Sequence, residues 1–221
     1  MNVYDALLER KSVRAFLDKP VGREVIERLL EAARHAPSGA NTQPWQVAVV
    51  SGDKKQEIQQ AMEACFRSGE RGKMDYQYYP EDWFSPFIER RRECGQQLYA
   101  ALGIDSSDKQ RRMDQWAANY RSFEAPVVLY FFLDGRLCTG SFVDSGMFLQ
   151  SMMLAAVEEG LATCPQAALG EYPDIVKAAL DYPQGNILLG GMALGYEDTD
   201  APVNSYRTAR QDVHTFTRFF E

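Results

Sequence analysis

The chain has 221 residues, of which 45% are hydrophobic, and it carries a formal net charge of −7. This length and composition predict one folded domain over residues 1–221, and the acidic balance argues against nucleic acid as a partner. The first residues lack a signal-peptide pattern and no apolar run approaches the ~20 residues that cross a bilayer, so we expect a cytoplasmic protein without a membrane partner.

The first third of the chain alternates helical patterns with one short strand. Asn2 is a suitable cap for the first helix, and apolar residues at helical spacing mark the second helix, which Pro37 ends. A polar loop, R-H-A-P-S-G-A-N-T-Q-P-W-Q at residues 34–46, follows. The predicted elements are a helix at 2–10, a helix at 23–36, a buried strand at 47–50 and a helix at 54–66.

The middle segment, residues 67–122, differs in composition from the rest of the chain. It combines a charged cluster at residues 90–93 with many aromatic residues, Tyr76 and Trp116 among them. We interpret it as helices joined by irregular segments, forming a variable helical excursion that acts as a lid over a substrate. For any single aromatic residue, ordinary core packing remains the alternative.

The last part of the chain contains the strongest strand signal. Residues 125–133, A-P-V-V-L-Y-F-F-L, are apolar at nearly every position, as expected of a strand covered on both faces. Residues 142–159 form a helical pattern so apolar that other elements or a second subunit must bury it. The remaining elements are a strand beginning at 161–164, a helix at 174–180, a strand at 186–194 and an irregular tail at 196–221. Helices thus outweigh strands, which predicts an α+β fold with a mixed β-sheet flanked by helices.

Basic residues gather just after the first predicted helix. The cluster consists of Arg10, Lys11, Ser12 and Arg14. Guanidinium groups and a hydroxyl suit a phosphate, although a solvated charged turn has the same composition. A second basic pair, Arg207 and Arg210, forms either another cationic patch or an ordinary exposed part of the tail.

The polar loop at residues 34–46 is the second candidate site. Ser38, Asn41 and Gln43 offer hydroxyl and amide groups, and Gly39 lets the backbone approach a ligand closely. Such a set can read the edge of a polar heterocycle. A loop that satisfies its own polar groups is the alternative.

Small residues mark the third candidate, T-C-P-Q-A-A at residues 163–168. They follow a proline where a predicted strand leaves the sheet, so their N–H groups could donate to an acceptor on a ligand ring. Gly190 and Gly191 lie inside the next predicted strand, where glycine indicates either a bulge or a close approach of the backbone.

Several motifs are missing, which narrows the chemistry. The chain lacks G-x-G-x-x-G, G-x-x-x-x-G-K-[ST], G-x-S-x-G and H-E-x-x-H. Four scattered cysteines and two distant histidines give no pattern for a disulfide framework or a metal site. Cys164 has no histidine motif beside it to make it a nucleophile. If the protein is an enzyme, a cofactor carries the difficult step, and we assign no catalytic side chain.

The order of these pieces resembles the nitroreductase family. R-K-S-V-R-A-F near the start is followed by A-P-S-G-A-N-T-Q-P-W-Q, then by C-P-Q-A-A-L and G-G-M-A-L-G-Y, and an arginine pair closes the series. The resemblance covers most of the chain and is weakest across 67–122. It implies an α+β fold, an intertwined homodimer with FMN at each subunit interface, and NADH or NADPH as electron donor. The chain looks most similar to the branch that reduces nitroaromatic compounds such as nitrobenzoate.

The resemblance also implies which residues contact FMN. The phosphate would be held by Arg10, Ser12, Arg14 and Arg207, with Lys11 at the flavin or ribityl region and Gly191 near the phosphate or ribityl chain. The ring would meet Ser38, Gly39, Asn41 and Gln43 from the other subunit and Pro165, Gln166, Ala167 and Ala168 from the same one. Some relatives carry an acidic residue and then a glycine after this proline, whereas this chain has Gln166 and Ala167. Whether an acidic side chain influences the flavin or the choice of electron donor is therefore open here.

The activity implied is ping-pong reduction of a nitroaromatic or quinone by NAD(P)H. Other reactions of the family, namely ene reduction, reductive dehalogenation and flavin breakdown, stay open, and so does a flavin-binding protein without turnover. Glu70, Lys73 and Tyr76, spaced by three, could clasp an amino-acid zwitterion as in the deiodinase branch, or arise by chance in a charged segment.

Overall fold

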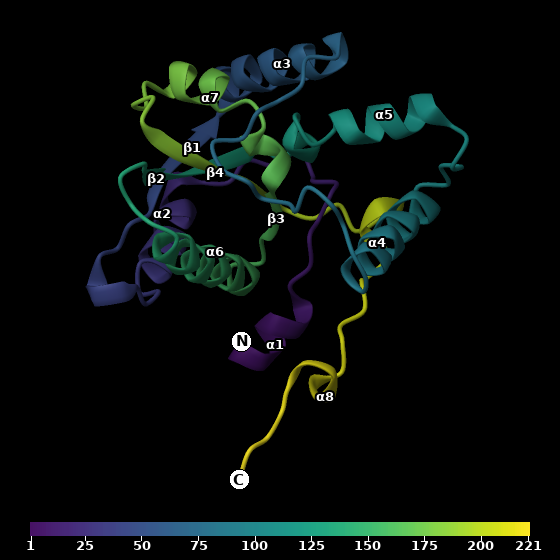
Figure 1. Ribbon diagram of the computed structural model, residues 1–221. Helices are drawn as coiled ribbons and strands as arrows, with labels where there is room; N and C mark the ends of the chain where they lie inside the picture. The colour runs from purple at the N-terminus through teal and green to yellow at the C-terminus, as the bar shows by residue number, and fades with distance from the viewer.

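The computed structural model describes residues 1–221. The fold is organised around one four-stranded sheet (Figure 1). The strands are β1 (Gln46–Ser51), β2 (Val127–Asp134), β3 (Ala162–Gln166) and β4 (Asn186–Gly195), in the order β1-β2-β4-β3. Every neighbouring pair is antiparallel, so the expected mixed sheet is wrong for these strands. Parallel pairing is confined to an isolated bridge between Ser12 and Thr163. The predicted helices between strands are long enough to connect parallel strands. Antiparallel strands can also be joined by long connections, so the alternation of elements did not reveal strand direction.

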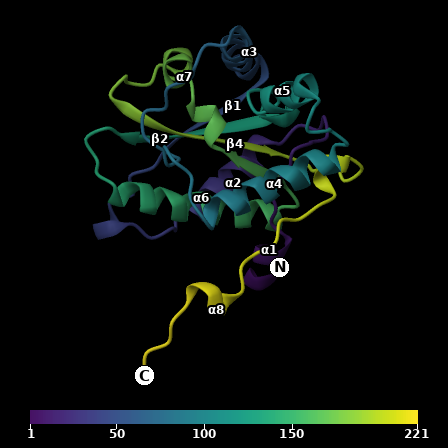
Figure 2. The same cartoon turned by 45° about the vertical axis from the view of Figure 1, so that its right-hand side comes forward.

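Two helical layers cover the sheet (Figures 1 and 2). Helices α2 (Arg23–Ala33) and α6 (Gly140–Glu158) pack on one face, and α3 (Gly52–Ser68) and α7 (Pro173–Leu180) pack on the other. The sequence of β2 is apolar at nearly every position because its side chains point alternately into the two layers, so both faces of the strand are buried. Leu129 and Phe131 join the α2 and α6 side, whereas Tyr130 and Phe132 join the α3 and α7 side. The predicted doubly covered strand is confirmed.

The first helix, α1 (Val3–Glu9), begins as the sequence predicts. The side chain of Asn2 accepts a hydrogen bond of 3.0 Å from the backbone N–H of Asp5, which caps the helix. The amino group of Met1 pairs with Glu158 at 2.8 Å and places α1 at the C-terminal end of α6. Val3 and Tyr4 on α1 are largely exposed.

The middle segment consists of helices joined by irregular chain, as expected. Its helices are α4 (Phe87–Ala101) and α5 (Lys109–Ala117), and no residue of α4 is buried. Near its start, the Tyr76 hydroxyl donates to the carbonyl of Leu189 at 2.8 Å. Lys177, almost fully buried on α7, pairs with Asp75 at 2.8 Å. These contacts attach the beginning of the segment to α7 and β4.

The tail leaves the main body after Asn204 and contains only the short helix α8 (Val213–Phe216) (Figures 1 and 2). Phe216, Phe219 and Phe220 are each more than 70% exposed. No helix of the protein combines the length and the apolar character needed to span a bilayer.

Candidate functional site

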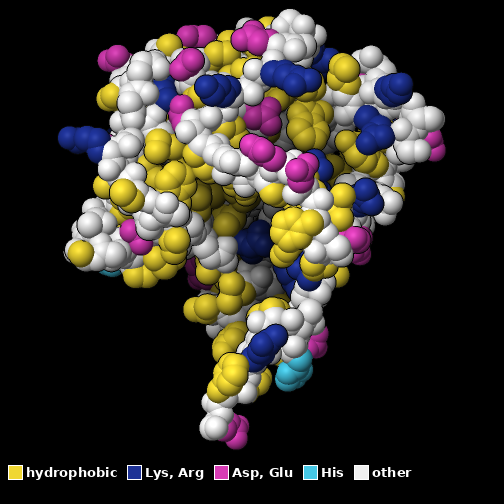
Figure 3. Space-filling model, viewed as in Figure 1, with side chains coloured by type: hydrophobic (Ala, Val, Ile, Leu, Met, Phe, Trp, Pro, Cys, Tyr) yellow, Lys and Arg dark blue, Asp and Glu magenta, His cyan; other side chains and the backbone are white.

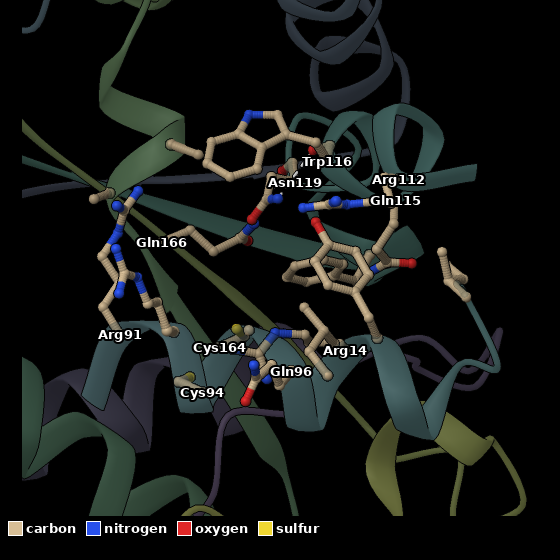
Figure 4. A pocket seen from close by; sticks show the side chains of 18 of the residues that line it. Arg14, Arg91, Cys94, Gln96, Arg112, Gln115, Trp116, Asn119, Cys164 and Gln166 are labelled. Atoms are coloured by element: carbon tan, nitrogen blue, oxygen red, sulfur yellow. Dashed lines mark hydrogen bonds between the residues drawn. The ribbon is translucent and has the colours of Figure 1, made fainter. Parts of the chain in front are cut away.

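A cleft of about 850 Å³ opens between the middle segment and the end of β3. Helices α4 and α5 form its walls, Cys164 and Gln166 lie on its floor, and Arg14 reaches it from the N-terminal segment (Figure 4). Figure 3 shows this face of the molecule hollowed, with basic side chains inside the hollow. The volume falls within the range of ~300–1,000 Å³ that small-molecule sites occupy.

One end of the site is cationic. The backbone N–H of Val13 donates to the carbonyl of Thr163 at 3.0 Å, which holds the predicted basic cluster beside β3. Arg14 is fixed by a 2.8 Å hydrogen bond from its backbone N–H to Asn204. Burial lowers the pKa of Arg10, and the neighbouring charges of Arg210 and Arg207 lower it further. Mutually repelling cations of this kind favour an anion between them.

Two members of the predicted set are already engaged within the protein. The ammonium group of Lys11 donates to the carbonyl of Asn204 at 2.7 Å and pairs with Glu197 at 2.7 Å. A flavin contact by Lys11 would therefore require this pair to open. The guanidinium of Arg207 donates to the carbonyls of Leu8, Glu9 and Arg10 at the end of α1. It satisfies carbonyls that a helix end leaves without partners and keeps its charge near Arg10.

The floor of the cleft is made by residues Pro165 to Ala168, which end β3 and begin a 3₁₀ turn. The Gln166 side chain is buried, and its amide nitrogen donates to the Asn119 carbonyl at 3.0 Å. Its amide oxygen has no hydrogen-bond partner in the protein. Ala167 and Ala168 add almost no bulk, so the turn leaves room for a flat ligand above it.

The two strand glycines accommodate protein rather than a ligand. A Cβ on Gly190, whose φ is +138°, would lie 2.8 Å from the carbonyl oxygen of Gln166. A Cβ on Gly191 would lie 2.6 Å from a methyl carbon of Leu169. The predicted close approach is confirmed, but Gly191 lies under Leu169 and does not line the cleft.

The polar loop lies elsewhere. The N–H of Gly39 donates to Asp144 near the start of α6, and Trp45 stacks on Phe148 of the same helix with ring centroids 4.8 Å apart. The basic cluster instead bridges to Thr163, just beyond the other end of α6. From Asp144 to Glu158 is fourteen residues, or about 20 Å of helix. The loop and the cleft of one chain are thus well separated (Figure 1).

The loop is partly self-satisfied and partly open. The Ser38 hydroxyl accepts from the N–H of Gln43 at 2.9 Å, and the Gln43 amide donates to the Asn41 carbonyl at 3.1 Å. The side chain of Asn41 is exposed and forms no hydrogen bond. Ala40, Asn41 and Gln43 all have positive φ values, a conformation that costs free energy for residues other than glycine. Such strain is often found at ligand sites.

Comparison with known proteins identifies this arrangement. The Nitroreductase family profile matches residues 7–196. This chain belongs to the nitroreductase family. It is 35% identical to the nitrobenzene nitroreductase of Ectopseudomonas oleovorans, over 97% of this chain and 95% of the relative. It is also 35% identical to the 4-nitrobenzoate reductase of Pseudomonas putida, over 98% and 95% of the two chains.

Two solved nitroreductases share the fold over the whole length of the chain. The FMN- and NADPH-dependent nitroreductase NfnB from Sphigopyxis sp. strain HMH superposes with a TM-score of 0.97 at 39% identity, covering 100% of both chains. NfnB from Mycobacterium smegmatis, solved in complex with NADPH, superposes with a TM-score of 0.93 at 33% identity, again over 100% of both chains. The middle segment is therefore part of the shared fold.

The residues of this nitroreductase fit FMN at both ends of the cleft. Arg10 and Arg14 form no salt bridge, so their charges are available to a phosphate. The small residues Ala167 and Ala168 leave space for a ring. Of these two predicted groups, the structure brings Arg14 and the small-residue floor to one cleft, whereas Arg10, Lys11 and Ser12 do not line it.

Other cleft residues of this nitroreductase had no sequence signal. Tyr120 is fully buried and its hydroxyl donates to Glu171, whose pKa is raised chiefly by burial. Glu171 and Asn119 line the cleft, yet each is an isolated polar residue in the sequence. Cys164 also lines it, but burial raises the pKa of this thiol to about 11. A protonated thiol is a poor nucleophile.

The three residues of the possible zwitterion clasp do not lie on a helix. Residues 70–76 are not helical, so their spacing by three does not place Glu70, Lys73 and Tyr76 on one face. The Tyr76 hydroxyl is engaged by Leu189, and the backbone carbonyl of Glu70 accepts from Tyr172.

Proposed function

We propose that the protein is an FMN-dependent oxidoreductase that reduces nitroaromatic or quinone-type acceptors with NADH or NADPH. When bound, FMN accepts two electrons from the nicotinamide and passes them to the acceptor, so the two substrates use the cleft in turn. The observation that carries the proposal is one cleft that joins unpaired arginines to a floor of small residues, in a fold shared with FMN- and NADPH-dependent nitroreductases.

The chain itself contributes binding and orientation. Arg10, Ser12 and Arg14 would hold the FMN phosphate, supported by the charge of Arg207. The floor from Pro165 to Ala168 would lie against the ring and offer backbone N–H donors to its edge. Lys11 would contact the flavin only after leaving its pair with Glu197, and Gly191 supports the site from beneath Leu169.

We also propose that the working unit is a homodimer. The Ser38–Gln43 loop lies at the opposite end of α6 from the cleft of its own chain, so it can complete an FMN site only in a partner. Val143 on α6 and several apolar residues of α1 are exposed, which is typical of a surface that another subunit covers. The exposed phenylalanines of the tail would wrap the partner.

The middle segment would form the wall of the substrate slot. Tyr99 and Trp116 line the cleft from α4 and α5 and can stack on flat acceptors. A protein that works in this way needs no side-chain nucleophile, in keeping with the raised pKa of Cys164. The expected cytoplasmic location stays a prediction.

Rapid mixing tests the function directly. The purified protein should carry an oxidised-flavin absorption band, which NADH or NADPH should bleach under anaerobic conditions. Addition of a nitroaromatic or a quinone should then restore the band. A flavin that is not bleached, or is not reoxidised by any such acceptor, would support a binding protein without turnover instead. Turnover of a halotyrosine in place of nitrobenzoate would support the deiodinase alternative.

Dilution tests the dimer. If the loop at Ser38–Gln43 completes the site of the partner, conditions that produce monomers should release FMN. The measurement is free FMN fluorescence against molar mass by light scattering. Retention of FMN by the monomer would contradict the shared site.

A further inference from the structure

The cleft is cationic although the protein as a whole carries a net charge of −7. It is lined by Arg14, Arg91, Arg92 and Arg112 against only two carboxylates, Asp105 and Glu171. Asp105 accepts from the Ser107 hydroxyl and Glu171 from the Tyr120 hydroxyl. None of the four arginines takes part in a salt bridge, so the excess positive charge is not neutralised within the protein.

Arg91 differs from the other arginines of the cleft in how it is held. Its guanidinium lies over the ring of Trp83 at 4.8 Å, and the other neighbour of that ring is Tyr79, with centroids 5.5 Å apart. A contact with a ring face occupies none of the N–H donors in a conventional hydrogen bond. Arg91 donates no hydrogen bond, so its N–H edge is free. By contrast, Arg14 donates to Ser12 and Arg112 donates to Ser106. Arg92 also donates no hydrogen bond, but its guanidinium lies over no aromatic ring that would hold it in one orientation.

The helix directs Arg91 into the cleft. Arg91, Gly95 and Leu98, spaced by three and four residues, all line it, whereas Arg90 lies over Phe87 and does not. Figure 4 shows Arg91 rising from α4 on one side of the cleft. A flat molecule placed over the floor at Gln166 would therefore have a planar, preoriented cation at its edge. The ligand that matches a free guanidinium fork is a carboxylate, which it binds through two parallel hydrogen bonds.

We infer that Arg91 binds the carboxylate of the electron acceptor, and that the preferred acceptors are nitro-substituted aromatic carboxylates. This role rests on the proposed function, because it assumes that the acceptor enters the cleft. Sequence similarity does not supply the preference, since the chain is equally similar to reductases named for nitrobenzene and for 4-nitrobenzoate. Arg91 provides a physical reason to distinguish them: only the second acceptor carries a charge for the fork to bind.

The test compares Arg91→Gln with Arg90→Gln in the FMN-loaded protein. Both arginines lie on α4, both contact an aromatic ring and neither forms an ion pair, but only Arg91 lines the cleft. The KM for 4-nitrobenzoate should rise at least tenfold in Arg91→Gln and stay within twofold in Arg90→Gln. The KM for nitrobenzene should change by less than twofold in both variants.

A binding measurement removes the dependence on turnover. Calorimetric titration of the oxidised FMN-loaded protein with benzoate should show at least tenfold weaker binding in Arg91→Gln, while binding of neutral benzamide should stay unchanged. Arg91→Lys keeps the charge but lacks the planar fork, so it should restore part of the benzoate affinity. It also serves as the second variant if Arg91→Gln loses FMN.

Several outcomes would overturn the role of Arg91. Equal losses for nitrobenzoate and nitrobenzene would indicate a general effect on the site, and equal effects of the two arginine variants would indicate long-range charge alone. A rise in the KM for NADPH but not NADH, with nitrobenzoate unaffected, would assign Arg91 to the donor phosphate. A wild-type protein that holds FMN and reduces both acceptors alike would retain the proposed function and lose only this inference. A protein without FMN would contradict the proposed function itself.

Discussion

Strand β2 and the middle segment are both rich in aromatic residues, but they use them in opposite ways. Every residue of β2 except Asp134 is buried, and Phe132 stacks on Tyr182 with ring centroids 3.9 Å apart. In the middle segment no residue of α4 is buried, and Phe84 is 59% exposed. Aromatic rings of β2 are removed from water on folding. In the middle segment Tyr120 is buried as well, but rings such as those of Phe84 and Trp116 stay available to a ligand or a partner.

The difference separates stability from specificity. Burial of apolar area in β2 contributes directly to the free energy of folding. The middle segment is attached near its start, through Asp75 with Lys177 and through Tyr76 with Leu189. Its exposed face can therefore change in sequence with little loss of stability. Variants in each region, each with a matched control, and the reactivity of one buried thiol test this contrast.

Truncation in the sheet should have the largest effect. Phe132→Ala should lower the free energy of unfolding by about 3–5 kcal/mol, because it leaves a cavity in a fully buried layer. The measurement is urea unfolding followed by circular dichroism. Phe84→Ala is the matched control in the middle segment and should cost less than about 1 kcal/mol. Equal losses would contradict the contrast.

Removal of the buried ion pair should have the next largest effect. Lys177→Met leaves Asp75 without its cation, which should cost about 3 kcal/mol of unfolding free energy. The backbone N–H of Leu188 still donates to Asp75 and limits the loss. Lys54→Met breaks the exposed pair with Glu57 and should cost under about 0.5 kcal/mol. Hydrogen exchange should show faster opening near Tyr76 in the first variant alone.

The cationic end of the cleft should affect ligand binding more than stability. The double variant Arg10→Ala, Arg14→Ala loses charge-assisted contacts worth about 1.5–3 kcal/mol each. FMN affinity should fall more than tenfold, measured by fluorescence titration of the FMN-free protein. Arg23→Ala, in the exposed pair with Glu27, is the control. Unchanged affinity in the double variant would refute the phosphate assignment.

The smallest expected effect concerns the Cys164 thiol, whose burial should change its reactivity and contribute slightly to the pH dependence of stability. Burial raises the pKa of this thiol from 9.0 to about 11. Iodoacetamide at pH 8 should therefore label the exposed Cys94 and Cys138 while Cys164 stays unmodified, as read by peptide mass spectrometry. The folded protein holds this proton more tightly than the unfolded chain. Stability from this group should consequently fall as pH rises from about 9 to about 11. Rapid labelling of native Cys164 would contradict its burial.

The helices and strands were largely predictable from local patterns. The Asn2 cap, the amphipathic helix after Gly22 and the apolar strand of β2 all formed, with ends shifted by a few residues. These signals are local, because caps and periodicity depend on neighbours in sequence. Strand direction was not predictable, and the expected mixed sheet proved antiparallel. Direction depends on contacts between residues far apart in the chain.

By itself the sequence determined the periodic elements, the basic cluster at Arg10–Arg14 and the small-residue floor, because each is a property of adjacent residues. Packing of the whole chain brings Arg14 of the basic cluster and the small-residue floor to one cleft, and it places the Ser38–Gln43 loop at the other end of α6. It also decided that Lys11 is paired, and that Arg91 lies on Trp83 with its edge free. The physical reason is that charge pairing and access depend on distances set by the packing of the whole chain, which adjacent residues do not encode.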